Sequence, residues 1–236
     1  MLKRTTQSKG QHRGIKQISV YRGPLPTRFK SFFYLLSLAA VIATIYGTAS
    51  LAAERQTVKS LLEIRQDKVI VQEWDLSCGA AALATLLNYQ HNDPVAEREV
   101  ATGLIQRKEY IETPELVKIR QGFSLLDLKR YADKRGYEGV GFGRLTIDDL
   151  IEHAPLIVPI SQHGYNHFVI FRGKKGNRVL LADPAWGNRT MLVEHFERAW
   201  IDFPEIGRVG FEVARRDETK PPNQLAPLPD DFVMLR

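Results

Sequence analysis

An uncharged stretch near the N-terminus constrains this chain more than any other feature. Residues 31–53 contain no Lys, Arg, Asp or Glu, and residues 1–30 contain eight bases and no acid. A basic segment followed by an apolar run and then small residues is the order of a secretory signal. The apolar run is also long enough to remain as a membrane-spanning helix, which needs about 20 residues. Residues 1–53 are therefore expected to be a basic region plus a signal peptide or membrane anchor.

The small residues at the end of this run offer two cleavage positions. Ser50-Leu51-Ala52 fits the small-x-small rule for cleavage after Ala52, and Gly47-Thr48-Ala49 is a weaker second site. A cleaved signal and a retained anchor both place the bases on the cytoplasmic side and the rest of the chain outside. We expect an exported protein, either periplasmic or tethered to the inner membrane through residues 31–53. A buried helix is the third interpretation.

The positive net charge of the chain comes from residues 1–30. The 236 residues carry 33 bases and 27 acids, a charge of +6, which on its face suggests nucleic acid or an anionic membrane as a partner. Eight of the 33 bases lie in residues 1–30, which leaves 25 bases against all 27 acids, a net charge of −2 from Glu54 onward. We therefore expect no nucleic-acid partner.

The first half of the exported part has helical signals. Ser77, Ser124 and Thr146 are placed to cap helices, because a hydroxyl can accept from the free amides of a first turn. Gly136 would end the third helix. Residues 108–121 have the character of a loop. The predicted helices cover about 78–89, 95–107, 125–135 and 146–153.

The second half changes to short β-branched or aromatic runs between turn signals. Lys174-Lys175-Gly176-Asn177 predicts a hairpin turn. Helices followed by an antiparallel sheet indicate an α+β domain over residues 54–214. Residues 215–236 contain four prolines and are expected to form a flexible tail. The predicted strands cover 155–161, 167–172, 178–182, 190–193 and 208–214.

Cys78 is the single cysteine of the chain, so it cannot form an internal disulfide. A lone cysteine can be a small buried hydrophobic residue. Cys78, however, stands at the first position of a predicted helix, where free amides and the helix dipole favour an anion. Since the thiolate is the reactive form, a nucleophile is the other interpretation.

A cysteine nucleophile needs a base, a group that orients the base, and donors for the developing oxyanion. If 167–172 and 178–183 pair across the hairpin turn, His167 and Asp183 meet at one end of it, as a base and its orienter require. Gln72 precedes the helix and could donate beside the Cys78 amide. Each residue also has a structural alternative: a surface histidine, an Asp-Pro turn, and a glutamine paired with backbone.

Three segments together resemble a known family. Residues 72–83 (QEWDLSCGAAAL) resemble the cysteine box of the bacteriocin-processing, double-glycine leader peptidases, 166–170 (NHFVI) their histidine box, and 182–187 (ADPAWG) their Asp-Pro-x-x-Gly segment. The similarity covers about residues 66–200. It implies a papain-like α+β fold with N-terminal helices packed on an antiparallel sheet. It also implies Cys78 as nucleophile, His167 as base, Asp183 as orienter and Gln72 as oxyanion donor.

The chain departs from this family in two respects. Members often have Asp immediately before the cysteine, where this chain has Ser77. The best-known members are domains of ABC exporters, whereas this sequence has no Walker A loop and no bundle of membrane spans. The cleavage of double-glycine leaders is therefore not carried over with the chemistry.

Two functions remain open from the sequence. The first is a cysteine peptidase that acts through an acyl-enzyme on exported or cell-envelope proteins or peptides, with acyl transfer to an amine as a variant. The second is a peptide-binding or surface-assembly accessory module of the same fold with little turnover. No cofactor is expected, and no metal, because no Cys/His cluster has zinc-site spacing.

Overall fold

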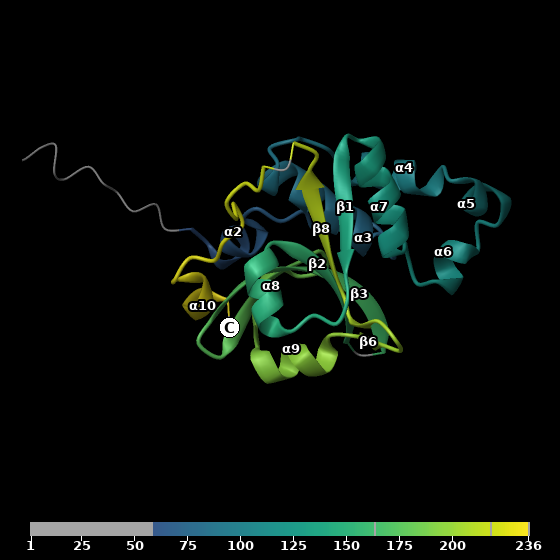
Figure 1. The fold of residues 1–236 in the computed structure, drawn as a ribbon. Coiled ribbons are helices and arrows are strands. Elements are labelled where there is room, and N and C mark those ends of the chain that lie inside the picture. Colours follow the sequence, from purple (N-terminus) through teal and green to yellow (C-terminus); the bar gives the residue numbers. More distant parts are fainter. Residues whose placement is uncertain (1–58, 163, 218, 236) are drawn as a thin grey trace, which may run out of the picture. The chain divides into compact units, whose positions relative to one another are not determined.

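The structure is a computed structural model that describes residues 59–162, 164–217 and 219–235 (Figure 1). The signal or anchor expected in residues 1–53 lies outside the described residues. Among the helices that are described, none has the length and apolar character needed to cross a membrane.

Helices fill most of the first half, as the sequence predicts. The helix that begins at Cys78 runs to Thr85 and continues as a π-helical turn, η1 (Leu86–Gln90). The α-helices of the described residues are α2 (Leu61–Gln66), α3 (Cys78–Thr85), α4 (Glu97–Ile105), α5 (Lys108–Glu112), α6 (Leu116–Ile119), α7 (Leu125–Lys134), α8 (Ile147–His153), α9 (Val193–Ala199) and α10 (Asp231–Met234).

A six-stranded antiparallel sheet follows, in the order β1-β8-β2-β3-β4-β5. Its strands are β1 (Tyr137–Phe142), β2 (Leu156–Gln162), β3 (Tyr165–Lys175), β4 (Arg178–Asp183), β5 (Gly187–Leu192) and β8 (Gly210–Arg215), and a separate small hairpin contains β6 (Asp202–Phe203) and β7 (Gly207–Arg208). The predicted α+β class is confirmed. Strand β1 and helix α9 were not predicted.

Helices cover both faces of the sheet because its strands alternate their side chains between two apolar clusters. In β2, Ile157 faces the cluster that contains α3, α4 and α7, while Leu156 and Val158 face the cluster of α8 and α9. Figure 1 shows α8 and α9 apart from α3, α4 and α7.

Helix α3 is the innermost helix, and all of its residues are buried. Its four alanines leave it narrow enough to lie close to β3. At Gly79 a Cβ atom would lie only 3.2 Å from the ring of Phe168. The helix that begins with Cys78 therefore packs directly on the strand that contains His167.

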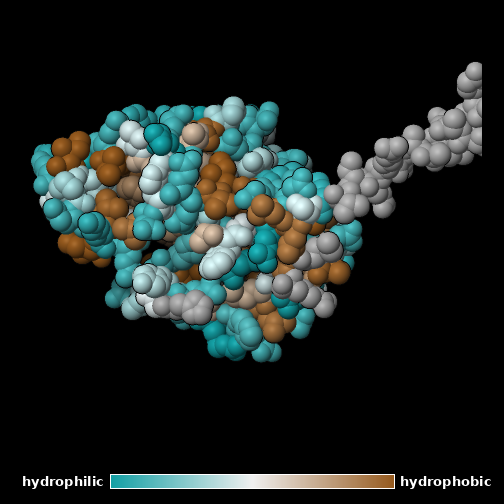
Figure 2. Space-filling model, turned by 180° about the vertical axis from the view of Figure 1, so that it is seen from behind, coloured by the Kyte–Doolittle hydropathy of each residue, from teal (hydrophilic) through white to brown (hydrophobic). Residues whose placement is uncertain are grey.

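Residues 108–121 are not a loop, contrary to the prediction, but contain α5 and α6. Both helices have fewer than six residues, too few to show a helical period in the sequence. Ile105, Ile111 and Ile119 are exposed at this end. Figure 2, which shows the molecule from behind, has brown hydrophobic side chains gathered there.

The C-terminal segment 219–235 is packed on the body, so the prediction of a flexible tail was wrong for these residues. Leu225, Phe232 and Leu235 are buried. Arg172 Nε donates to the carbonyl of Leu225 at 2.6 Å, and the carbonyl of Leu235 accepts from Thr190 N–H at 2.9 Å. The prolines keep this segment out of the sheet, but the apolar residues between them still bury their side chains.

Candidate active site

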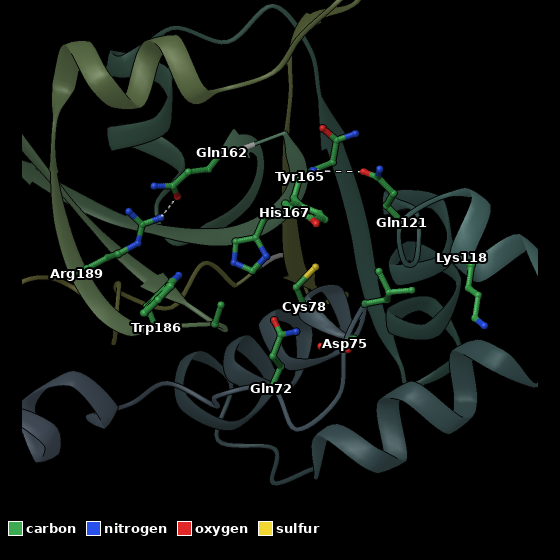
Figure 3. A pocket seen from close by; sticks show the side chains of 13 residues that line it. Gln72, Asp75, Cys78, Lys118, Gln121, Gln162, Tyr165, His167, Trp186 and Arg189 are labelled. Atoms are coloured by element: carbon green, nitrogen blue, oxygen red, sulfur yellow. Dashed lines mark hydrogen bonds between the residues drawn. The ribbon is translucent and has the colours of Figure 1, made fainter.

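Cys78 begins helix α3, as predicted, and lines a pocket of about 910 Å³. The first amides of a helix have no acceptor inside it, so the N–H of Cys78 is free to serve another group. In Figure 3 the sulfur of Cys78 lies beside the ring of His167, with which it interacts. Cys78 is only 6% exposed, yet it is one of the residues that line the pocket.

The predicted cap at Ser77 was wrong. The Ser77 side chain makes no hydrogen bond to the first turn of α3. Its oxygen lies 2.5 Å from Oε1 of Glu97 and 2.6 Å from the carbonyl oxygen of Trp74. The Ser77 hydroxyl therefore interacts with Glu97 and with the loop before the helix, and it does not accept from the first-turn amides of α3.

His167 and Asp183 meet at one end of the β3–β4 hairpin, as the predicted pairing requires. Ile170 pairs with Ala182 in the register, and a bulge at Phe171–Gly173 separates this part from the turn. Nε2 of His167 donates to Oδ1 of Asp183 at 2.7 Å. One hydrogen bond thus joins two residues whose positions in the sequence differ by sixteen.

The surroundings of His167 favour its cationic form. Burial lowers the pKa of His167, but its hydrogen bonds and charge interactions with Asp183 and Cys78 raise it more, to about 9. Because Nε2 is engaged by Asp183, Nδ1 is the ring nitrogen left to face Cys78. An imidazolium beside a thiol stabilises the thiolate, which is the nucleophilic form.

Asp183 is fully buried and remains ionised. Burial raises the pKa of Asp183, whereas His167, the charge of Arg189 and the N–H of Ala185 lower it more, so the net shift is downward. Ala185 N–H donates to Oδ1 at 2.9 Å. A buried carboxylate with this many donors is held in one orientation.

Arg189 is a residue of the site that the sequence reasoning missed. Its Nε donates to Oδ2 of Asp183 at 2.7 Å, and its Nη2 donates to Oε1 of Gln162 at 2.9 Å. The predicted strand began at residue 190, so Arg189 was left in the preceding turn. A strand that starts at Gly187, directly opposite Asp183 in the register, would have identified it.

Gln72 lines the same pocket and lies below Cys78 and His167 in the view of Figure 3. Its backbone N–H donates to the carbonyl of Pro184 at 2.8 Å, which ties it to the turn after Asp183. Its Nε2 donates one hydrogen to the carbonyl of Trp74 at 2.9 Å. The amide has a second hydrogen, and Figure 3 shows the amide directed toward the space between Cys78 and His167.

The structure therefore places three of the four predicted site residues, Gln72, Cys78 and His167, in the wall of one pocket, and Asp183 is buried in hydrogen-bond contact with His167. In the other walls of this pocket, Trp186 and Tyr165 are largely exposed. Gln121 accepts a hydrogen bond from Asn166 N–H at 3.4 Å across the pocket (Figure 3). Within the described ranges, no group of three or more His, Cys, Asp or Glu is arranged to hold a metal ion.

Comparisons with known proteins identify the family of this chain. Residues 66–203 match the model of the peptidase C39 family. The chain is 34% identical over 188 residues to "Probable functional amyloid protease FapD" of Pseudomonas aeruginosa, covering 77% of this chain and 80% of that protein. It is also 34% identical over 160 residues to the protein of that name from Pseudomonas fluorescens, covering 66% of this chain and 68% of that protein.

Among solved structures, the peptidase domain of Streptococcus ComA, described as a bi-functional ABC transporter involved in a quorum-sensing pathway, is 18% identical. It superposes with a TM-score of 0.50 over 63% of this chain and 98% of that domain. This likeness concerns the fold, and it agrees with the predicted papain-like arrangement. The chain therefore belongs to the peptidase C39 family and is a cysteine peptidase.

Proposed function

We propose that the peptidase activity of this chain rests on Cys78, His167, Asp183 and Gln72, and that its substrates are exported or cell-envelope proteins or peptides. The observation that carries the residue assignment is the contact of His167 with Cys78 on one side and Asp183 on the other, which raises the pKa of His167 to about 9. A cationic imidazole beside the only cysteine is the arrangement that a thiol acyl-enzyme mechanism needs.

In the acylation step, Nδ1 of His167 already holds the proton that the Cys78 thiol has given up, and the thiolate sulfur attacks the carbonyl carbon of the substrate. The carbonyl oxygen becomes an oxyanion, which would accept hydrogen bonds from the Cys78 N–H and the second hydrogen of Gln72 Nε2. Collapse of this intermediate breaks the C–N bond, and His167 returns its proton to the leaving amine.

In the deacylation step, His167 removes a proton from water, which attacks the thioester and releases the acid and the Cys78 sulfur. An amine in place of water would give acyl transfer by the same steps. Asp183 keeps Nε2 of His167 protonated throughout and so leaves Nδ1 to exchange the proton.

The substrate class follows from two separate considerations. The basic and apolar order of residues 1–53 supports export, with the body in the periplasm or tethered to the inner membrane. The relative from Pseudomonas aeruginosa bears the name of a functional amyloid protease. We therefore propose that this chain cleaves an exported protein of a functional amyloid system, in a segment extended enough to enter the pocket.

Cleavage in cells tests this function. Envelope and secreted proteins of the native organism would be compared for new N-termini between the wild type and a Cys78→Ala variant. We expect a small set of exported proteins to lose a specific internal N-terminus in the variant. An identical set of N-termini would argue against proteolysis and for the accessory module with little turnover.

A further inference from the structure

A buried carboxylate holds the loop that joins Gln72 to Cys78. Glu97 begins helix α4, and only 4% of its surface is exposed. Its Oε2 accepts from Glu73 N–H at 2.8 Å, and its Oε1 accepts from the Ser77 hydroxyl at 2.5 Å. Both oxygens of the buried group are therefore bonded to this one loop, while the positive end of α4 favours the negative charge.

These two contacts lie next to the two proposed oxyanion donors. Glu73 follows Gln72 in the chain, and Ser77 precedes Cys78. The two oxygens of Glu97 thus fix the two ends of the loop relative to each other. Any change in the position of Glu97 would change the distance between the side chain of Gln72 and the N–H of Cys78.

The loop itself does not have regular structure that could hold its shape. Leu76 has a φ of 68°, in the left-handed region that is unfavourable for a leucine. The carbonyl of Trp74 accepts from Gln72 Nε2, at 2.9 Å, and from the backbone N–H of Ser77, at 3.4 Å. Such a conformation persists only where its surroundings impose it, and Glu97 is the charged group that contacts it at both ends.

We propose that Glu97 is a positioning residue that sets the geometry of the oxyanion donors Gln72 Nε2 and Cys78 N–H. This inference rests on the roles proposed above for Gln72 and Cys78. Glu97 does not touch the reacting atoms; it acts through Glu73 and Ser77. The arrangement also explains the serine at position 77, because an aspartate there would place a second carboxylate against Glu97.

Two reactions of Cys78 separate this role from a general structural one. Iodoacetamide alkylates the thiolate at a saturated carbon, so no oxyanion forms and only Cys78 and His167 matter. p-Nitrophenyl acetate acylates the same sulfur through a tetrahedral oxyanion. Loss of an oxyanion donor typically costs roughly 10²–10³-fold in rate. A variant with disordered oxyanion donors should therefore lose acylation and keep alkylation.

The experiment measures both rates for the full chain and the variants Glu97→Gln, Ser77→Ala and Gln72→Ala. Glu97→Gln keeps the size of the side chain but cannot accept at both ends. We expect acylation to fall ~10-fold or more in Glu97→Gln and in Gln72→Ala, with alkylation within about twofold of wild type. Ser77→Ala removes one of the two contacts and should show a smaller fall.

Glu99→Gln is the matched control, because Glu99 lies on the same helix with an exposed side chain paired to Arg135. In Glu99→Gln, the rates of alkylation and of acylation should both equal those of wild type.

Unchanged acylation in Glu97→Gln, with the expected loss in Gln72→Ala, would overturn the inference and leave the proposed function intact. Equal loss of alkylation and acylation in Glu97→Gln would also overturn it, since Glu97 would then support the whole site. Unchanged acylation in Gln72→Ala would instead contradict the proposed function.

Discussion

Arg189 and Asp183 form a salt bridge of 2.7 Å on the side of the carboxylate that His167 does not use. His167 contacts Oδ1 and Arg189 contacts Oδ2, so the buried carboxylate has a charged partner at each oxygen. Arg189 thus helps to orient the imidazole of His167 through Asp183, although Arg189 makes no hydrogen bond to His167 itself.

The salt bridge predicts the effect of Arg189→Met. The substitution leaves Oδ2 of Asp183 buried without its charged donor, which costs about 1–3 kcal/mol of stability. A carboxylate that can turn also lets the imidazole turn, and we expect the acylation rate by p-nitrophenyl acetate to fall roughly 10- to 100-fold. Stopped-flow acylation and urea denaturation measure the two effects.

Arg178→Met is the control for this prediction. Arg178 lies on the same β4–β5 hairpin and donates to the side chain of Thr190. It does not line the pocket. An equal loss of acylation in Arg178→Met would mean that the effect of Arg189 comes from the hairpin as a whole.

Asp183→Asn removes the largest favourable influence on the His167 cation. The pKa of His167 then falls, because its hydrogen bond and charge interaction with Asp183 raise that pKa. The acylation rate should drop by roughly 10²-fold, in the range of general acid–base contributions. The pH dependence of iodoacetamide alkylation measures the shift in the same variant. A rate and a pH profile equal to those of wild type would show that Asp183 does not orient His167.

The raised pKa of His167 also predicts how stability depends on pH. The pKa of His167 rises from 6.5 to about 9 on folding, so folding favours the protonated form. The stabilisation from His167 is therefore complete below pH 6.5 and is lost as the pH rises through about 9. Urea denaturation of wild type and His167→Ala between pH 6 and pH 9.5 should show a stability difference that shrinks with rising pH. A difference that is constant across this window would contradict the raised pKa.

The packing of residues 219–235 predicts that this segment contributes to the stability of the protein. Leu225 is fully buried, so Leu225→Ala should lower the free energy of unfolding by about 2–5 kcal/mol. Leu228 lies in the same segment but is 65% exposed. Leu228→Ala should therefore change the free energy of unfolding by less than about 0.5 kcal/mol. Equal, small effects of both substitutions in urea denaturation would favour a loose tail.

The elements that sequence reasoning predicted correctly depend on local interactions. Helices α7 and α8 begin with capping boxes, Ser124 with Asp127 and Thr146 with Asp149, in which the partners are three residues apart. The β3–β4 hairpin depends on the turn at Gly176, which has a φ of 56°. This hairpin is what brought His167 and Asp183 together in the prediction.

The contacts that sequence reasoning missed join residues from different elements. The sequence analysis singled out nothing at Glu97, and it predicted Ser77, twenty residues earlier, as a helix cap. Only the packing of α4 beside α3 shows that they bind each other. Arg189 was missed because the predicted strand began at residue 190, whereas β5 begins at Gly187, where its register with β4 starts.

The reactivity of Cys78 at mildly acidic pH is the decisive measurement for the Cys78–His167 pair. An ordinary thiol is only about 0.1% ionised at pH 5.5. A proton transferred to His167 would leave Cys78 as a thiolate at this pH, so iodoacetamide should modify native Cys78 at least ~10-fold faster than the denatured chain. His167→Ala should remove most of this advantage. Equally slow modification of the native wild type, the variant and the denatured chain would contradict the assignment of Cys78 as the activated nucleophile.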